Sequence, residues 1–218
     1  LLSIDEVSTF FHEFGHSLDT LFDDGVYRDR SVPRDAVELP SQIMENWALE
    51  PELLKLYARH YRTKEVIPEA LVEKLKSARL FNQGFETVEY LAASFLDMAW
   101  HTQSGGEAID VRSFEAGAMA ALGLMPSIVP RYRTPYFNHM ISGYAAGYYS
   151  YEWSGVLDKD AFEAFKEKGL FDRGVAASFR KNILAKLGTE DAMELYKRFR
   201  GAEPRIEPLL RSRGLLEE

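Results

Sequence analysis

Apolar and polar positions do not alternate over any run of five or six residues in this chain. Apolar-rich stretches of helical length occur instead, separated by Gly, Pro and Asp. This pattern predicts a mainly α fold, with helices over these ranges: 4–22, 35–59, 68–80, 83–101, 111–123, 159–168, 172–187 and 190–200, and a short last helix from near Pro204.

Several helix boundaries follow from individual residues. Pro51 is expected to bend or break the helix over 35–59, because a proline inside a helix removes a hydrogen bond. Asp158 and Thr189 are expected to cap the N-termini of helices 159–168 and 190–200. All 218 residues are expected to form a single domain.

The polar stretch over 23–34 is predicted to be a loop. An α+β domain with a minor hairpin in this loop is the alternative layout. No internal repeat or low-complexity tract interrupts the chain.

Composition narrows the function. The net charge of −8 argues against a nucleic-acid partner, and no apolar run approaches a membrane span. Cysteine is absent, so any metal must be held by His and carboxylate side chains. We expect a cytoplasmic protein without disulfides.

The segment His12-Glu13-Phe14-Gly15-His16 lies in the first predicted helix. Residues i and i+4 share one face of a helix, so both imidazoles can reach one cation. This is the H-E-x-x-H arrangement of zinc peptidases, in which the Glu activates a water molecule without binding the metal. A catalytic zinc normally has a third protein ligand, and Glu38 is our candidate for it.

An isolated H-E-x-x-H can also be two histidines with ordinary hydrogen bonds on a helix. Gly15 argues for a site, because it costs roughly 1 kcal/mol of helix stability relative to Ala and allows close approach. The rest of the helix is apolar, and buried polar groups there would need a partner such as a metal. Its apolar residues are Val7, Phe10, Phe11, Phe14, Leu18, Leu21 and Phe22.

A second group of chemically capable residues lies over 139–151, where four tyrosines, two glycines and a histidine occur within 13 residues. Core packing is the simpler explanation for any single tyrosine. The glycines instead indicate a backbone that flexes or approaches a ligand. Phenols and imidazoles placed there could donate hydrogen bonds to an oxyanion.

Taken together, these segments resemble zinc oligopeptidases of the thimet oligopeptidase, oligopeptidase A and peptidyl-dipeptidase family, most of all its bacterial peptidyl-dipeptidase (Dcp) branch. The resemblance extends over essentially the whole chain. The matching stretches are Leu2–Val7 with His12–His16, Pro33–Gln42, Asn82–Phe85, Arg131–Arg133 and Tyr144–Tyr149.

The resemblance implies a helical zincin-type catalytic domain, neurolysin-like, with one Zn²⁺ per chain. It implies that His12, His16 and Glu38 bind zinc and that Glu13 polarises the attacking water. His139 and Tyr151 are implied to be catalytic, with Tyr151 as the oxyanion donor. Tyr144 and Tyr148 are implied to bind the substrate.

Three residues outside this set have weaker candidate roles. Glu45 lies two turns beyond Glu38 and is expected either to support a histidine ligand or to be an ordinary solvated glutamate. Arg131 or Arg133 could meet a peptide C-terminal carboxylate, although an ion pair within the protein is the simpler role for each.

The chain also departs from the family pattern. Relatives usually have about three more residues between the second histidine and the third ligand. The position three after His16, often another histidine in relatives, is Asp19 here. Relatives are much longer, so the chain is expected to be a C-terminal fragment whose partner is the missing N-terminal half.

The expected function is therefore a zinc metallopeptidase that hydrolyses short peptides and releases C-terminal dipeptides. A non-catalytic, zinc-binding helical module that binds peptides is the main alternative for a chain lacking the N-terminal half. A zinc hydrolase of non-peptide substrates is a weaker one.

Overall fold

The structure, a computed structural model, describes residues 1–27 and 30–216. The chain divides into two compact units. The first unit comprises Leu1–Phe81 with Ser154–Glu218, and the second comprises Asn82–Trp153. The single domain expected over residues 1–218 stays a prediction.

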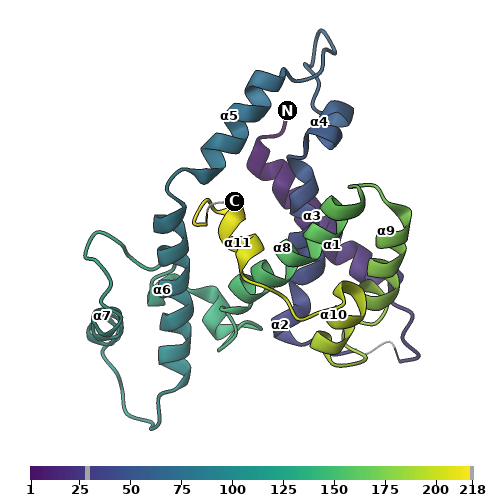
Figure 1. The fold of residues 1–218 in the computed structure, drawn as a ribbon. Coiled ribbons are helices and arrows are strands. Elements are labelled where there is room, and N and C mark those ends of the chain that lie inside the picture. The colour runs from purple at the N-terminus through teal and green to yellow at the C-terminus, as the bar shows by residue number, and fades with distance from the viewer. Residues whose placement is uncertain (28–29, 217–218) are drawn as a thin grey trace. The chain divides into compact units, whose positions relative to one another are not determined.

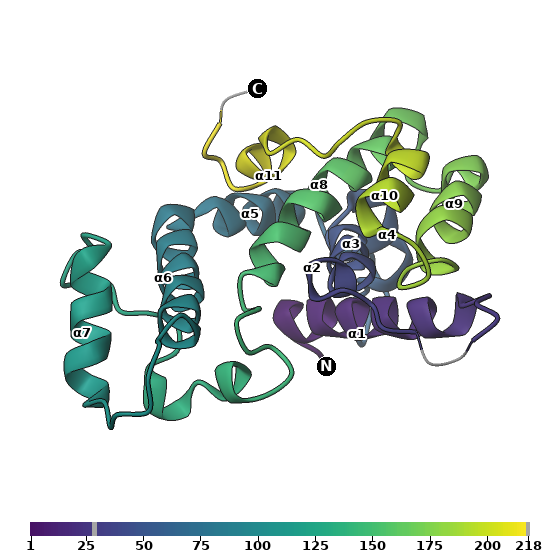
Figure 2. The same cartoon turned by 90° about the horizontal axis from the view of Figure 1, so that it is seen from below.

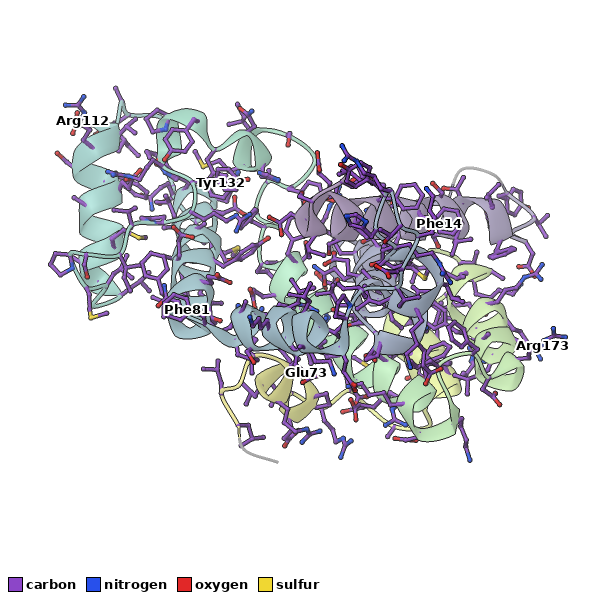
Figure 3. The ribbon with its side chains drawn as sticks, turned by 90° about the horizontal axis from the view of Figure 1, so that it is seen from above. Phe14, Glu73, Phe81, Arg112, Tyr132 and Arg173 are labelled. Atoms are coloured by element: carbon purple, nitrogen blue, oxygen red, sulfur yellow. The ribbon has the colours of Figure 1, made fainter. Side chains whose placement is uncertain are left out.

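Helix α1 (Ile4–Phe22) has the bounds that the sequence predicts. Its start is fixed by a capping box, in which the Ser3 hydroxyl accepts from the Glu6 amide and the Glu6 carboxylate accepts from the Ser3 amide. One side of α1 packs against α3 (Leu39–Ala48), as Figure 1 shows. Phe14, labelled in Figure 3, lies on the exposed side.

The helix expected over 35–59 is three helices, so its predicted continuity is wrong beyond the expected break at Pro51. These are α2 (Arg34–Val37), α3 and α4 (Pro51–Tyr57). Pro40 lies in the first turn of α3 and Pro51 begins α4, positions where a missing amide costs no intrahelical bond. The chain therefore turns at Glu38, between α2 and α3.

The C-terminal helices correct two predicted caps. Helix α8 (Ser150–Lys168) begins eight residues before Asp158, which lies in its buried interior and accepts from Asn46 Nδ2 at 2.8 Å. Helix α10 (Ala192–Arg200) is capped by Asp191, not by Thr189. Asp158 is used in a buried hydrogen bond instead of a cap. At α10 the Asp191 carboxylate, two residues after Thr189, accepts the capping hydrogen bond.

The remaining helices of the first unit are α5 (Glu69–Leu80), α9 (Arg173–Phe179) and α11 (Glu207–Ser212). A single π turn, η3 (Arg180–Leu184), extends α9, so the helix expected over 172–187 is irregular at its end. The core packs α2, α3, α8, α9, η3 and α10 together around a set of buried apolar side chains. Its members include Leu39, Ile43, Leu157, Phe162, Phe165, Phe179, Ile183 and Leu195.

The second unit contains α6 (Gln83–His101), α7 (Val111–Ala121) and the short 3₁₀ turns η1 (Thr134–Tyr136) and η2 (Asn138–Ile141). Helices α6 and α7 lie side by side in Figures 1 and 2. The core of this unit is largely aromatic. It comprises Ala93, Phe137, Met140 and Tyr148, with Tyr90, Trp100, Tyr132 and Tyr151 against them.

The mainly α prediction is confirmed. Residues 1–27 and 30–216 form no strand, only two isolated bridges, Arg59–Val66 and Leu187–Glu190. The alternative hairpin therefore has no support over 23–27 and 30–34, and residues 28 and 29 lie outside the described residues. In the described chain, no helix is both long and apolar enough to cross a bilayer.

Candidate functional site

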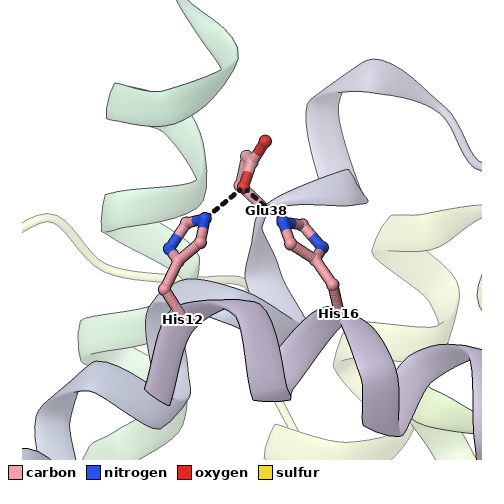
Figure 4. A group of neighbouring side chains, drawn as sticks. All are labelled: His12, His16 and Glu38. Atoms are coloured by element: carbon pink, nitrogen blue, oxygen red, sulfur yellow. Dashed lines mark ion pairs between the residues drawn. The ribbon is translucent and has the colours of Figure 1, made fainter. Parts of the chain in front are cut away.

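Three predicted ligands meet in the first unit. His12 and His16 project from one side of α1 toward Glu38, at the turn between α2 and α3 (Figure 4). Glu38 Oε2 lies 3.4 Å from His12 Nε2 and 3.2 Å from His16 Nε2. The ligand atoms of all three side chains lie within 4.8 Å of one another. The structure thus brings the predicted ligand set together across 22 residues of sequence.

The absence of a side chain at Gly15 brings these groups together. A Cβ built on Gly15 would lie 2.1 Å from the Pro40 carbonyl oxygen and 2.6 Å from Ser41 Cα. Glycine is therefore required where α1 crosses the first turn of α3. This close crossing holds the Glu38 carboxylate above the two imidazoles.

Two further residues orient the ligands. Ser41 Oγ donates to Glu38 Oε2 at 2.9 Å, and both residues are buried. Glu45 Oε1 lies 2.6 Å from His12 Nδ1, which gives Glu45 the supporting contact that its spacing predicts. With Nδ1 bound to a carboxylate, Nε2 of His12 is left to face Glu38.

His12 binds a proton more tightly than an ordinary histidine does, so its pKa is raised. Burial alone lowers the pKa of His12, but hydrogen bonds and charge from Glu38 and Glu45 outweigh it and raise that pKa to about 10. A buried carboxylate between two imidazoles therefore has a strong demand for positive charge. A metal ion can satisfy that demand in place of the proton.

The donor set fits zinc. Two imidazole nitrogens and one carboxylate form the His₂Glu set found in catalytic zinc sites. Ligand atoms about 2.0–2.1 Å from a tetrahedral ion are about 3.3 Å from each other, and the two N–O distances here are 3.4 and 3.2 Å.

Glu13 and Asp19 are the remaining charged positions of this helix segment. Glu13 is exposed, directly beside His12. Asp19, the departure from the family pattern, is bound by Arg30, whose Nη2 lies 2.9 Å from Asp19 Oδ2. Arg30 also donates to the carbonyl oxygens of Asp19 and Leu187, so it joins the end of α1 to the turn after η3. Asp19 therefore has a partner of its own.

The second predicted group gathers in the second unit. The rings of Tyr144 and Tyr151 stack with centroids 5.1 Å apart and planes 11° apart. The His139 ring lies 5.7 Å from that of Tyr144 and 6.0 Å from that of Tyr151. Tyr151 lies in the first turn of α8. Two phenols and an imidazole are thus held together on one cluster.

Tyr148 differs from these two tyrosines. It is 1% exposed and stacks on Tyr90 with ring centroids 5.0 Å apart. Burial raises the pKa of Tyr148, and the hydrogen bond with Tyr90 offsets only part of this, so that the pKa is about 12. Its contacts are those of a core residue, and its substrate-binding role stays a prediction.

The two arginines near this cluster also have partners. Arg133 pairs with the buried carboxylate of Glu115, the role within the protein that the sequence analysis favours for it. The Arg131 guanidinium carbon lies over the Tyr90 ring, 5.2 Å from its centroid, which is inside the limit of about 6 Å for a cation–π contact.

Sequence reasoning missed the buried acid Asp97. Asp97 of α6 is 0% exposed and accepts from the amides of Ala146 and Tyr148. The available signal was a lone carboxylate in the apolar run Leu96-Asp97-Met98-Ala99-Trp100. A charge is rarely fully buried without a partner, so such a position calls for one.

Comparison with known proteins gives the same assignment. Peptidase family M3 matches residues 1–215. The chain is 45% identical over 221 residues to dipeptidyl carboxypeptidase of Escherichia coli (strain K12) and 39% identical over 228 residues to oligopeptidase A of the same strain. It is 30% identical over 220 residues to a thimet-like oligopeptidase of Dictyostelium discoideum.

Each of these alignments covers 99% of this chain. The chain spans about a third of the length of these relatives, 32%, 32% and 33% respectively. The family match extends over both units, including the three-residue cluster and the tyrosine segment. The predicted family is confirmed: this chain belongs to peptidase family M3.

Proposed function

We propose that this chain carries the catalytic centre of a zinc metallopeptidase that hydrolyses short peptides. The observation that carries the proposal is the convergence of His12, His16 and Glu38, with Glu13 beside the first histidine. Membership of peptidase family M3 supplies the class of reaction.

His12, His16 and Glu38 are the proposed zinc ligands, with Glu45 and Ser41 orienting two of them. When bound, zinc lowers the pKa of a water molecule and polarises a carbonyl group. Glu13 takes a proton from the attacking water molecule while the oxygen of that water bonds to the scissile carbonyl carbon. Glu13 then delivers that proton to the leaving amine as the C–N bond breaks.

Tyr151 is the proposed donor to the oxyanion, with His139 assisting it. The contacts of both rings with Tyr144 support this role, because packed rings hold donors in fixed positions without reorganisation. Tyr144 and Tyr148 are proposed to contact the substrate backbone.

Release of C-terminal dipeptides is proposed as the specificity. One relative is named dipeptidyl carboxypeptidase, and its identity to this chain, 45%, exceeds the 39% of oligopeptidase A. Because the chain spans about a third of such relatives, an N-terminal half is the proposed partner that completes the peptide channel. A cytoplasmic location belongs to the same proposal.

Glu13→Gln tests the mechanism. The substitution keeps the shape of the side chain and removes its basicity, so hydrolysis of a fluorogenic peptide is expected to fall by at least about a hundredfold. Zinc content is expected to stay near one ion per chain. Asp5→Asn, an exposed acid of the same helix, is the matched control and should retain full activity.

Hydrolysis that survives Glu13→Gln would refute the assigned base. Stoichiometric zinc with no hydrolysis in the parent chain would instead favour the non-catalytic peptide-binding module. The absence of zinc would refute the ligand set.

Peptides that differ only at their C-terminus test the specificity. A dipeptide-releasing enzyme must recognise the terminal carboxylate, so C-terminal amidation should greatly reduce cleavage. Equal cleavage of the acid and the amide, with products other than a dipeptide, would contradict this specificity and favour internal cleavage.

A further inference from the structure

Asp97 is the only carboxylate of α6 that is fully buried in the described chain, and its oxygens contact two backbone amides and the His101 ring. Its Oδ1 accepts from the Ala146 amide at 3.2 Å and lies 2.9 Å from His101 Nδ1. Its Oδ2 accepts from the Tyr148 amide at 3.0 Å. Both oxygens therefore bind backbone amides of one segment, 142–149, which runs through consecutive turns.

That segment has a conformation that its own residues do not favour. Ala146 has a φ of 52°, in the left-handed region that costs a residue with a Cβ of order 1 kcal/mol. An alanine stays there only when its surroundings fix it. The amide of Ala146 is one of the two held by Asp97, so the strained residue and the buried acceptor are directly bonded.

The second bond fixes the segment against the core. The Tyr148 amide binds Asp97 while the Tyr148 ring packs on Tyr90 and Phe137. The same ring lies 5.0 Å from His139 and 5.4 Å from Tyr151. A shift of the Tyr148 backbone would therefore move the cluster that holds His139 and Tyr151.

We propose that Asp97 is a positioning residue, which fixes the turn around Ala146 and Tyr148 and thereby aligns His139, Tyr144 and Tyr151 for peptide hydrolysis. The catalytic half of this inference rests on the proposed function. The structural half does not. The His101 side chain contacts the Asp97 carboxylate from the more exposed side and is itself 30% exposed.

Asp97→Asn is the test, measured on the 218-residue chain. Asparagine keeps one acceptor oxygen but turns an N–H toward an amide donor, so one of the two backbone bonds is lost. Amide hydrogen exchange over 142–150 is expected to be at least about tenfold faster. Exchange in α1 and α3, and zinc content, should not change.

Steady-state kinetics of peptide hydrolysis distinguish misaligned hydrogen-bond donors from a general loss of folded protein. Misplaced donors act on the transition state, so kcat should fall roughly tenfold to a hundredfold while KM changes little. Asp110→Ala is the matched control, because it removes the N-cap of α7 in the same unit without touching the segment. This control should leave kcat and the exchange over 142–150 unchanged.

His101 supplies a second pair of variants should Asp97→Asn fail to fold. His101→Gln keeps a hydrogen-bonding side chain beside the Asp97 carboxylate and the Ala146 amide, and should preserve exchange protection. His101→Leu removes both contacts and should lose part of the protection and of kcat.

If exchange over 142–150 were unchanged in Asp97→Asn, the proposal that Asp97 fixes this segment would be refuted. If Asp97→Asn does not fold, unchanged exchange in His101→Leu would refute it instead. Faster exchange with an unchanged kcat would show a structural role only and overturn the positioning role. A parent chain that hydrolyses no peptide would refute the proposed function for this chain, while the exchange data would still decide whether Asp97 anchors the segment.

Discussion

Gly15→Ala adds one methyl group at the crossing of α1 and α3, and its cost can be worked from the structure. The added Cβ would meet the Pro40 carbonyl oxygen at 2.1 Å, the Pro40 carbonyl carbon at 2.7 Å and Ser41 Cα at 2.6 Å. All three are backbone atoms, so no side-chain rotation relieves the clash. Ordinary contact at about 3.4 Å requires the helices to separate by about 1.3 Å at this point.

Two opposing terms set the change in stability. Overpacking of a close contact costs up to about 3 kcal/mol. Replacing glycine by alanine inside a helix returns about 1 kcal/mol. The net loss is therefore up to about 2 kcal/mol, which lowers the melting temperature of a chain this size by up to roughly 4–8 °C. The same separation draws Glu38 away from His12 and His16, so zinc affinity should fall by at least about tenfold.

Thermal unfolding and competitive zinc titration measure the two effects. Gly117→Ala is the matched control, because Gly117 lies inside α7 and an added Cβ there meets nothing within 4 Å. It should stabilise by up to about 1 kcal/mol. If Gly15→Ala were as stable as the parent and bound zinc equally well, the close crossing would not be what positions the ligands.

Three further predictions follow from other contacts. Glu45→Gln weakens the partner of His12 Nδ1, so zinc affinity should fall about 10–100-fold in a chelator competition while the fold is retained. Chelation should lower the melting temperature of the zinc-loaded chain, because an ion held at 1,000 times its Kd stabilises by about 4 kcal/mol; an unchanged melting temperature would contradict a bound metal. Burial raises the pKa of Glu115, but the Thr134 amide and Arg133 outweigh it and lower that pKa below 4.5. The ionised form thus stabilises the second unit above the unfolded-state pKa, and this stability is lost as the pH falls through the lowered pKa. Glu115→Gln should cost about 1–3 kcal/mol in urea unfolding at neutral pH and progressively less in acid.

Local signals in the sequence predicted part of the fold well. The bounds of α1 and α6 follow from local apolar patterning and end signals, and both agree with the structure. Asp158 failed as a predicted cap because its bond to Asn46 joins residues 112 positions apart, which no local pattern encodes. The break at Glu38 was missed because the spacing of apolar residues continues through it.

In the candidate site too, local relationships were predictable from the sequence and contacts between distant residues were not. His12 and His16 are related by helix geometry alone, so their pairing was predictable. Glu38 was a choice among many acids, and only the crossing at Gly15 shows how it reaches the histidines. Asp97 escaped prediction because the two amides that it binds, those of Ala146 and Tyr148, lie 49 and 51 positions further along the chain, where no local pattern connects them to it.

The contacts that Arg30 makes with Asp19 and Leu187 have a consequence for protein engineering. Arg30 is tied to Asp19 and to the Leu187 carbonyl, and Val32 lies against Gly188, so the approach to α2 is fixed from Arg30 onward. The loop between the end of α1 and Arg30 includes none of the three proposed ligands. Inserting a tag or a sensor domain after Val26 should therefore leave the spacing of Glu38 and the histidines intact. By the same reasoning, a change in the number of residues between Val26 and Arg30 should leave the ligand geometry intact.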